Sequence, residues 1–443
     1  MASADADRDT IAAVATPTGR GGIGVVRVSG PAAAAIAAAV TGRVPPPREA
    51  TFCAFRDVRG EVLDEGIALY FPAPHSFTGE PVLELQGHGG PMVMQALLRA
   101  CLDRGARLAE PGEFTRRAFL EGRLDLAQAE AVADLIDAAS QEAARSAVRS
   151  LTGEFSAAVA AVVSKLVELR ALTEAMLDFP EEDLDALQRD DAAGRLAQIR
   201  EALHYLIARS RQGSLLRSGI HVVLAGRPNV GKSSLLNRLA GEERAIVTPI
   251  PGTTRDALRE SIQIEGVPLV IVDTAGLRAS PDAVERISIE HAQREIERAD
   301  LVLAVFEAGE REAHLEGLPS DIARLCVYNK LDLAPEFRPP ASRERAVAVS
   351  AKTGAGIDEL RAAILEAAGW VSAGESVFLA RERHLRAFGI ARAHLERAAG
   401  ELARPELFAE DLRLAHQAMS SVTGEFSADD LLGEIFGRFC LGK

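Results

Sequence analysis

Cysteine, tryptophan and long apolar runs are scarce in this sequence, and each scarcity excludes a class of protein. Its 443 residues include four cysteines and one tryptophan, and no two cysteines form a C-x-x-C pair. We therefore expect neither a disulfide framework nor a zinc site, and a reducing cytoplasm fits best. The longest alanine-rich run, residues 32–40, is too short to cross a bilayer. Residues 1–7 lack the pattern of a signal peptide, so we expect a cytoplasmic protein with no membrane segment.

Positive charge is also in short supply. The formal net charge is −14, which argues against a protein that wraps nucleic acid over most of its surface. The net charge does not exclude a local basic groove or nucleic-acid binding that is shared with a partner. The apolar fraction of 47% and the charged fraction of 26% are ordinary for a globular protein, and the length predicts two or three domains.

Residues 226–233 form the strongest motif, a glycine-rich loop of the pattern G-x-x-x-x-G-K-S. An apolar, β-branched run at 220–225 precedes the loop, and residues 234–239 follow it with helical spacing. Phosphate binding requires this order, because backbone N–H groups and the positive end of a helix must face the phosphates. Lys232 can then reach the β- and γ-phosphates, and the Ser233 hydroxyl can bind Mg²⁺. A chance glycine-rich turn does not explain both flanks, so a nucleotide site is predicted.

Three further motifs, the last accompanied by a short S-A-K segment, follow in the order that a guanine-nucleotide switch requires. Residues 252–256 (G-T-T-R-D) offer a hydroxyl to Mg²⁺, and residues 273–276 (D-T-A-G) can sense the γ-phosphate. Residues 329–332 (N-K-L-D) select the base, because the Asp332 carboxylate can accept from the ring N–H and the amine of guanine. Residues 350–352 (S-A-K) supply donors to the guanine oxygen. Together the four motifs predict GTP as the ligand.

GTP hydrolysis needs a group that orients the attacking water. Many switch proteins place a glutamine directly after the D-x-x-G glycine, but here that residue is Leu277. Glu285 is one candidate for the role, and the alternative for it is a solvated carboxylate at a helix start. Asn229 could hold a monovalent cation beside the phosphates. Near the end of the chain, Cys440 either places a thiol between domains or anchors the tail as a small buried side chain.

The rest of the chain divides by its periodicity. Residues 10–120 alternate short β-like runs with turns, which predicts an α+β domain. Residues 118–217 have helical spacing, and helices return after residue 378. Either one helical domain interrupted by the nucleotide domain or two separate bundles accounts for this pattern.

A second glycine motif, Gly19-x-Gly21-x-x-Gly24, formally matches a dinucleotide-binding fingerprint. That fingerprint requires a helix after the glycines, whereas a strand-like run follows here. We therefore reject a dinucleotide site in this region.

Several stretches outside the nucleotide motifs are typical of one family. They are residues 15–24 (A-T-P-T-G-R-G-G-I-G), 76–80 (S-F-T-G-E), 83–90 (L-E-L-Q-G-H-G-G), 124–130 (L-D-L-A-Q-A-E) and 439–443 (F-C-L-G-K). With these stretches and the nucleotide motifs, the chain resembles the MnmE (TrmE) family of tRNA uridine-modification GTPases over essentially its whole length. This family lies within the TrmE-Era-EngA-YihA-Septin-like GTPase superfamily, whose other P-loop members lack the N-terminal and terminal stretches.

The resemblance implies a multidomain fold. It places an α+β folate-binding and dimerisation domain at 1–120, two parts of an α-helical domain at 121–216 and 374–443, and an inserted Ras-like α/β P-loop GTPase domain at 217–373. It also implies a homodimer and a heterotetramer with the FAD-binding partner MnmG. The pair would add a carboxymethylaminomethyl or aminomethyl group to C5 of the tRNA wobble uridine. The one-carbon unit would come from 5-formyl- or methylene-tetrahydrofolate, and potassium would stimulate GTP hydrolysis.

The resemblance carries roles onto particular residues by matching position. Glu285 matches the water-orienting glutamate of the family, and Cys440 matches a cysteine proposed to act in the modification chemistry. Potassium ligands are matched by Asn229, Thr248, Thr253 and the carbonyl of Ile250, and Mg²⁺ ligands by Ser233 and Thr254. Folate-site residues are matched by Arg27, Glu84, Arg123 and Lys443. Arg123 stands where many family members have lysine, which keeps the charge and changes the geometry.

The predicted GTP-binding residues come from all four nucleotide motifs, from the segment 248–251 and from the S-A-K segment. They are Asn229, Val230, Gly231, Lys232, Ser233, Ser234, Thr248, Pro249, Ile250, Pro251, Gly252, Thr253, Thr254, Asp273, Thr274, Ala275, Gly276, Asn329, Lys330, Leu331, Asp332, Ser350, Ala351 and Lys352. The alternative function is a GTP-dependent ribosome-assembly factor. Such proteins usually carry a basic RNA-binding module, which this acidic chain lacks.

Overall fold

The computed structural model describes residues 9–178, 185–241, 259–273, 299–310, 322–340, 345–371, 377–425, 429–437, 439 and 442. By compactness the chain forms two units. The first unites Met1–Ala133 with Met419–Lys443, and the second is Asp134–Ala418. The four domain segments predicted from the sequence differ from these two compact units, and their boundaries stay predictions.

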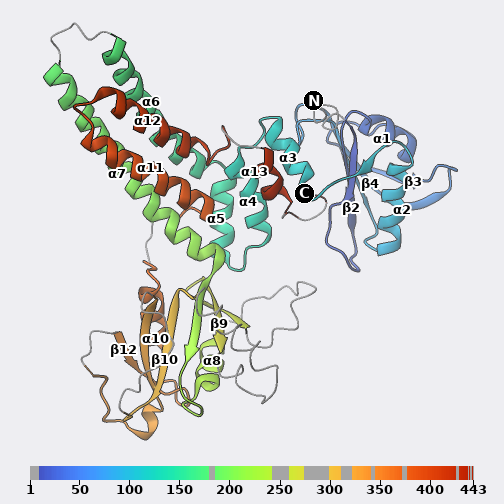
Figure 1. Cartoon of the computed structure of the whole chain (residues 1–443). Helices are drawn as coiled ribbons and strands as arrows, with labels where there is room; N and C mark the ends of the chain where they lie inside the picture. The colour runs from blue at the N-terminus through green and yellow to red at the C-terminus, as the bar shows by residue number, and fades with distance from the viewer. Residues whose placement is uncertain are drawn as a thin grey trace, which may run out of the picture. The chain divides into compact units, whose positions relative to one another are not determined.

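The first unit is built on a six-stranded sheet (Figure 1). Its strands are β1 (Ile11–Val14), β2 (Gly24–Ser29), β3 (Thr51–Arg56), β4 (Val62–Phe71), β5 (Val82–Gly87) and β6 (Arg107–Leu108). They lie in the order β3-β4-β5-β2-β1-β6, and every neighbouring pair is antiparallel except β1 with β6. Gly24 begins strand β2. A strand therefore follows the second glycine motif, as predicted from the sequence, where a dinucleotide site would require a helix.

The two faces of this sheet carry different side chains. Helices α1 (Ala33–Thr41) and α2 (Pro91–Leu102) pack on one face with a core that includes Val26, Val28 and Leu83. Helix α3 (Glu113–Leu120) contributes Phe114 to a small cluster with Ile11. Successive residues of a strand point to opposite faces, so Arg27 lies on the face away from α1 and α2, where its guanidinium approaches the Phe114 ring.

The end of the chain returns to the first unit. Helix α13 (Asp429–Phe436) packs with the start of α4 (Leu126–Ile136) in a cluster that includes Leu126, Phe436 and Phe439. Gly442 comes so close to β1 that an added Cβ would lie 2.5 Å from the Val14 carbonyl oxygen. This approach requires glycine, which also has a φ of 89°.

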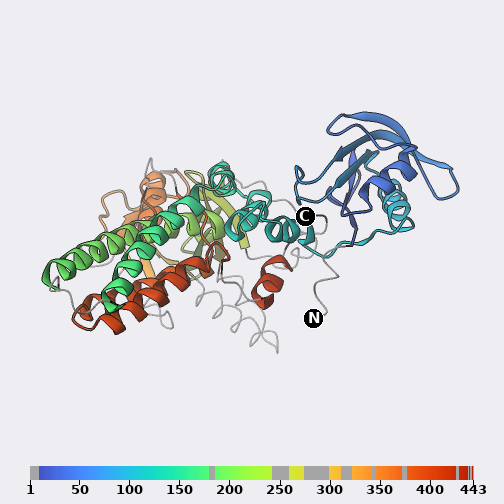
Figure 2. The same ribbon diagram turned by 90° about the horizontal axis from the view of Figure 1, so that it is seen from above.

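The second unit contains long helices that confirm the helical period of the sequence. They are α5 (Gln141–Leu151), α6 (Glu154–Asp178), α7 (Asp185–Ser218), α11 (Glu382–Gly400) and α12 (Pro405–Ser420). Helix α7 packs against both α6 and α11 (Figure 2). None of the described helices is long and apolar enough to span a membrane.

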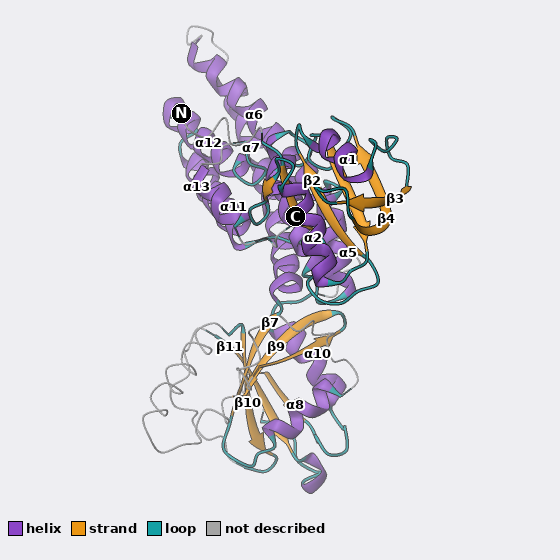
Figure 3. Ribbon diagram, turned by 90° about the vertical axis from the view of Figure 1, so that its right-hand side faces the viewer, coloured by secondary structure: helices purple, strands orange, loops and turns teal. Residues whose placement is uncertain are grey.

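The nucleotide-binding region of this unit is a sheet with helices (Figure 3). Its strands are β7 (Ile220–Ala225), β8 (Arg259–Ile264), β9 (Val267–Asp273), β10 (Leu301–Glu307), β11 (Ala323–Asn329) and β12 (Arg345–Ala348), accompanied by helices α8 (Lys232–Ala240) and α10 (Ile357–Ala367). The order is β12-β11-β10-β7-β9-β8, and only β8 is antiparallel to its neighbour. The chain changes direction across the sheet at β7, which is where such folds bind ligands. The predicted multidomain fold class is confirmed.

The buried Asp134 carboxylate binds both of the chain segments that connect the helices to the nucleotide-binding region. Asp134 Oδ1 accepts from Arg217 Nε at 3.0 Å and from Arg381 Nη2 at 2.8 Å. Arg217 is in the last turn of α7, just before β7, and Arg381 directly precedes α11. The Asp134 side chain is 7% exposed. The chain therefore enters and leaves the nucleotide-binding region beside one oxygen atom.

Candidate functional site

The glycine-rich loop connects β7 to α8, as its flanks predicted. Gly231 has a φ of 95° and Asn229 a φ of 66°, both in the left-handed region. A Cβ on Gly231 would overlap the side-chain amide nitrogen of Asn329. Glycine is therefore required here for both conformation and space, and the overlap shows how closely the loop packs against the N-K-x-D motif.

Lys232 is the first residue of α8 and is 5% exposed. Its Nζ donates to the carbonyl oxygens of Gly226 at 2.8 Å and Arg227 at 3.0 Å. These bonds hold the ammonium inside the curve of the loop, at the positive end of the helix. A phosphate group bound there would meet the ammonium and the helix dipole together.

Asn329 joins two of the predicted motifs. Its side chain donates to the Val230 carbonyl at 2.9 Å and accepts from the Ala351 N–H at 3.0 Å. Asn329 is 2% exposed, and its bond to the Val230 carbonyl is buried away from water. The phosphate loop and the S-A-K motif are thus held by one side chain that comes from the end of β11.

Asp332, the predicted base-selecting carboxylate, is held by the S-A-K segment. The Ser350 hydroxyl donates to Asp332 Oδ1 at 2.6 Å, and Ser350 Oγ accepts from the Thr353 N–H at 3.1 Å. The hydroxyl bond is the main cause of a pKa for Asp332 below its ordinary value. Desolvation opposes it, and a backbone hydrogen bond and the charges of Lys352 and Lys330 add smaller lowering effects. The carboxylate therefore stays ionised and keeps its acceptor capacity at neutral pH.

Glu307 contacts the N-K-L-D motif, although none of the sequence motifs includes this residue. It ends strand β10, and its carboxylate accepts from Lys330 Nζ at 2.7 Å. Lys330 has a φ of 65°, so its backbone is fixed in a left-handed turn between β11 and the short helix Leu331–Leu333. A carboxylate at the end of a buried strand is the only sequence signal for this partner.

The structure brings together the described part of the predicted nucleotide site. Val230 is buried and Ser233 and Ser234 are exposed at the start of α8, while Asp273 ends β9 next to β7. Several predicted residues lie outside the described part of the chain. They are Thr248, Pro249, Ile250, Pro251, Gly252, Thr253, Thr254, Thr274, Ala275, Gly276, Leu277, Glu285, Cys440 and Lys443.

A second charged site lies in the first unit. Arg27 and Glu84 are paired in register on β2 and β5, and Arg27 Nη2 lies 2.8 Å from Glu84 Oε1. The Arg27 guanidinium also lies 5.5 Å from the centroid of the Phe77 ring and 5.8 Å from that of Phe114. Arg123 approaches the loop that carries Phe77, since its Cγ would be 3.5 Å from a Cβ on Gly79. Of the four predicted folate-site residues, Arg27 and Glu84 therefore contact each other, and Arg123 lies next to the loop that carries Phe77.

A buried network of charges supports this site, and the sequence did not predict it. Arg117 is 3% exposed and donates to Glu113 at 2.9 Å, to Asp9 at 2.6 Å and to Glu80 at 3.1 Å. Arg107 pairs with the same Glu113 and Asp9. Burial opposes ionisation of Glu113, but hydrogen bonds from Arg107, the Glu110 N–H and Arg117 outweigh it and lower its pKa. Glu80 belongs to the Phe77 loop, so the network fixes that loop to α3.

The fold and the site define a P-loop GTPase. A glycine-rich loop between a central strand and a helix, joined by the Asn329 side chain to the S-A-K segment whose Ser350 donates to Asp332, is the arrangement of that class. Residues 10–123 match the family described as GTP-binding protein TrmE N-terminus, and residues 126–440 match the MnmE helical domain.

The curated relatives cover the chain from end to end. The tRNA modification GTPase MnmE of Azoarcus sp. is 60% identical over 444 residues, with 98% of each chain covered. The protein of the same name from Thiobacillus denitrificans is 58% identical over 439 residues, again with 98% of each covered. The chain belongs to the MnmE family of tRNA modification GTPases, which confirms the resemblance drawn from its motifs.

Proposed function

We propose that this GTPase acts with the flavin-containing partner MnmG to modify C5 of the wobble uridine of tRNA. The added group is carboxymethylaminomethyl or aminomethyl, and its one-carbon unit comes from tetrahydrofolate. The observation that carries the proposal is the presence, in one chain of this family, of a guanine-nucleotide site and a separate Arg27–Glu84 site. The protein works in the cytoplasm as a homodimer and forms a heterotetramer with MnmG.

The Arg27–Glu84 site has the chemistry that a reduced folate requires. Bound folate supplies the one-carbon unit. Glu84 can accept from the ring N–H and amine of the pterin, in the way proposed for Asp332 and guanine. Phe77 and Phe114 offer aromatic faces beside its partner Arg27. Arg27 orients Glu84, because its Nη2 lies 2.8 Å from Glu84 Oε1.

The tail of the chain supports a place for Lys443 in the same site. Gly442 lies against Val14, and Val14 is adjacent to Ala13, the residue of β1 that is paired in register with Arg27. A cation at the tail can neutralise a carboxylate of the folate, as can Arg123. Cys440, also in the tail, is proposed to act in the modification chemistry.

GTP hydrolysis in this proposal depends on groups other than a glutamine, because Leu277 follows the D-T-A-G motif. Glu285 orients the attacking water, and Ser233 and Thr254 bind Mg²⁺. Asn229 joins Thr248, Thr253 and the Ile250 carbonyl around potassium, whose charge replaces that of an arginine finger. The exposed position of Asn229 in the phosphate loop supports this second task.

The proposal is tested by reconstitution. The chain is combined with MnmG, GTP, potassium, a reduced folate and tRNA, and the wobble nucleoside is analysed by mass spectrometry. We expect a modified uridine with the native chain and little modification with Arg27→Ala, which should keep its GTP affinity. An unmodified uridine in a validated assay, together with co-sedimentation of the chain with ribosomal subunits, would favour the assembly-factor alternative.

The catalytic part is tested separately by GTP turnover. Replacing sodium by potassium should raise the rate sharply, and equal rates in the two salts would contradict the role of the cation. Glu285→Ala should bind GTP with native affinity and hydrolyse it slowly. Near-native turnover of that variant would assign the water to another residue.

A further inference from the structure

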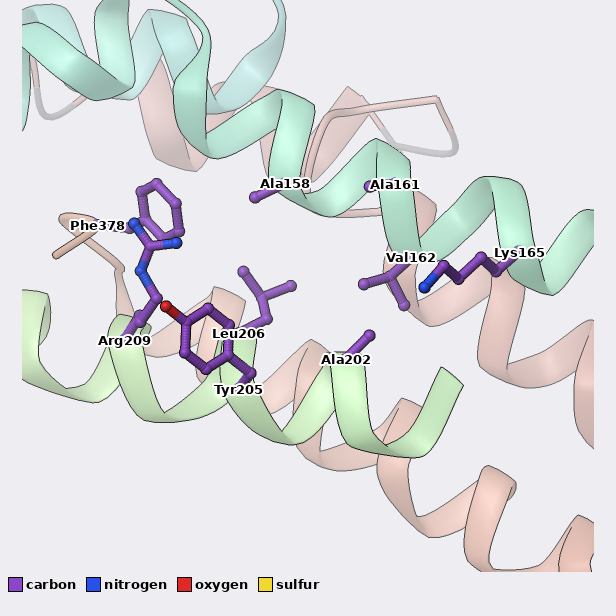
Figure 4. A pocket seen from close by; sticks show the side chains of 9 residues that line it. All are labelled: Ala158, Ala161, Val162, Lys165, Ala202, Tyr205, Leu206, Arg209 and Phe378. Atoms are coloured by element: carbon purple, nitrogen blue, oxygen red, sulfur yellow. The ribbon is translucent and has the colours of Figure 1, made fainter. Parts of the chain in front are cut away.

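Helices α6 and α7 enclose a pocket that none of the proposed steps uses (Figure 4). Its volume is about 220 Å³. The space exists because both helices present alanines toward it, namely Ala158 and Ala161 on α6 and Ala202 on α7. Pockets for drug-sized ligands are larger, at roughly 300–1,000 Å³, so this one fits a single ring system whose attached groups extend outside.

The two ends of the pocket are cationic. Lys165 follows Ala158 by about two helical turns, or ~10 Å, and Arg209 follows Ala202 by the same spacing. Figure 4 shows Lys165 and Arg209 at opposite ends of the row of lining side chains. No aspartate or glutamate is among the residues that line the pocket. The pocket is therefore an apolar slot with a positive charge at each end.

The Arg209 end is rigidly built. The Arg209 guanidinium carbon lies 4.0 Å from the centroid of the Phe378 ring, and Phe378 is 2% exposed. The Phe378 backbone lies directly on α7 at Gly213, where an added Cβ would overlap its carbonyl oxygen. The Phe378 ring also packs on Phe155, at 5.3 Å between centroids. Buried packing thus holds the aromatic ring over which this cation lies.

An exposed aromatic ring lies beside the same end. Tyr205 lines the pocket, is 51% exposed, and has its ring centroid 5.4 Å from the Arg209 guanidinium carbon. Helix α7 carries six arginines against three aspartates and one glutamate, a net positive charge in a chain of net charge −14. An aromatic face, a cation at each end and a basic helix are the features that bind single-stranded nucleic acid.

We propose that this pocket binds one unstacked nucleotide of the tRNA substrate. The base lies between the alanine walls with Tyr205 at its face, and the flanking phosphates meet Lys165 and Arg209. The inference rests on the proposed function, because it takes tRNA as the molecule that supplies the nucleotide. It assigns to the helical part of the chain a contact with RNA that the overall acidity of the sequence does not suggest.

The test uses the full chain, with and without MnmG, and a fluorescently labelled tRNA transcript with an unmodified wobble uridine. Tyr205→Ala should weaken binding about five- to 100-fold, as loss of one stacked base does. Ala202→Leu fills the slot and should have an effect in the same direction. Lys165→Gln should weaken binding and lower the slope of affinity against salt by about 0.7, the contribution of one single-stranded phosphate.

Arg200→Gln is the matched control, since Arg200 is exposed on α7 and does not line the pocket. It should change tRNA affinity much less than Lys165→Gln. GTP turnover without RNA should be native in all four variants, which shows that they fold. Photocrosslinking of tRNA carrying 4-thiouridine should join the RNA to a peptide of α6 or α7.

The outcomes separate this proposal from the one on which it rests. If the native chain binds and modifies tRNA while Tyr205→Ala and Ala202→Leu bind equally well, the pocket proposal is overturned and the proposed function stands. Equal losses for Lys165→Gln and Arg200→Gln, with no effect of Tyr205→Ala, would reduce the contact to general charge attraction and also overturn it. A native chain that neither binds nor modifies tRNA contradicts both proposals.

Discussion

The two charged sites of this chain are built on different parts of their sheets. In the nucleotide-binding region, Asn329 is the last residue of β11, and Lys232 and Asp332 lie in the segments that follow β7 and β11. In the first unit, Arg27 and Glu84 project from the paired strands themselves. Loops can change conformation when a phosphate leaves, whereas strand register cannot. The nucleotide site is therefore suited to switching, and we call it the switching site. The geometry of the Arg27–Glu84 site is fixed before a ligand binds, and we call it the preset site.

The buried charge network should be the most sensitive part of the preset site. Arg117→Leu leaves Glu80 without its cation and leaves Asp9 and Glu113 with Arg107 alone. Loss of one partner of a buried ion pair costs about 3–5 kcal/mol. The unfolding of the first unit, followed by hydrogen exchange of its strands, should shift by this amount. Fluorescence of the single tryptophan, Trp370, reports the second unit and should be unchanged.

Arg59 provides the control for that experiment, because its side chain is 73% exposed and its ion pairs lie at the surface. Arg59→Leu should leave the stability of the first unit nearly unchanged. An equally small effect of Arg117→Leu would show that the network is not needed for stability.

The switching site should lose its function without losing its fold. Lys232→Ala removes a positioned cation from the phosphates and should reduce GTP hydrolysis about 10²–10³-fold. Folate affinity, measured by isothermal titration, should be native. Arg27→Ala should show the reverse pattern. A variant of either kind that lost both activities would show that the two sites are not independent.

Base selection gives a smaller effect with a chemical rescue. Asp332→Asn should weaken GTP affinity about 10- to 100-fold, since a charge-assisted hydrogen bond contributes about 1.5–3 kcal/mol. Xanthosine triphosphate, which carries an oxygen in place of the guanine amine, should bind this variant better than the native chain. Asp358→Asn, at a side chain that is 93% exposed in the same region, is the control. Discrimination unchanged by Asp332→Asn would contradict the assignment.

The smallest expected effect is on the pH dependence of stability. Despite burial, hydrogen bonds from Arg107 and Arg117 lower the pKa of Asp9 and of Glu113 from ordinary values of 3.8 and 4.5. Their contribution is thus fully present above about pH 4.5 and is lost as pH falls through the lowered values. Urea unfolding of the first unit should show this acid dependence, and Glu113→Gln should flatten it. An identical slope for native and variant chains would exclude Glu113 as a source.

Contiguous motifs explain why the nucleotide site could be predicted. A phosphate loop needs consecutive residues, so Lys232 and Ser233 are recognisable without any knowledge of the fold. The double role of Asn329 was not predictable, because its partners Val230 and Ala351 come from separate parts of the chain. The Lys330–Glu307 pair was missed for the same reason.

The preset site is less visible in the sequence. Arg27 and Glu84 are 57 positions apart, and their contact depends on the register between β2 and β5. Alternation of side chains predicts which residues share a face of a strand, but it does not predict which residue lies opposite. Only the family resemblance pointed to this pair. Helix α1, an alanine-rich run, and the short strand β6 also escaped prediction because neither has a distinctive period.

Asp134 has a consequence for the modular construction of the chain. Arg217 and Arg381 donate to the same oxygen atom, so the two ends of the nucleotide-binding region lie next to each other. A segment whose ends meet can be inserted into a host protein, or deleted from it, without stretching the surrounding helices. Joining residue 217 to residue 381 through a short glycine-serine linker should therefore leave α7 packed against α11. The nucleotide-binding region is in this sense a removable insertion, and the Asp134 carboxylate binds both of its ends.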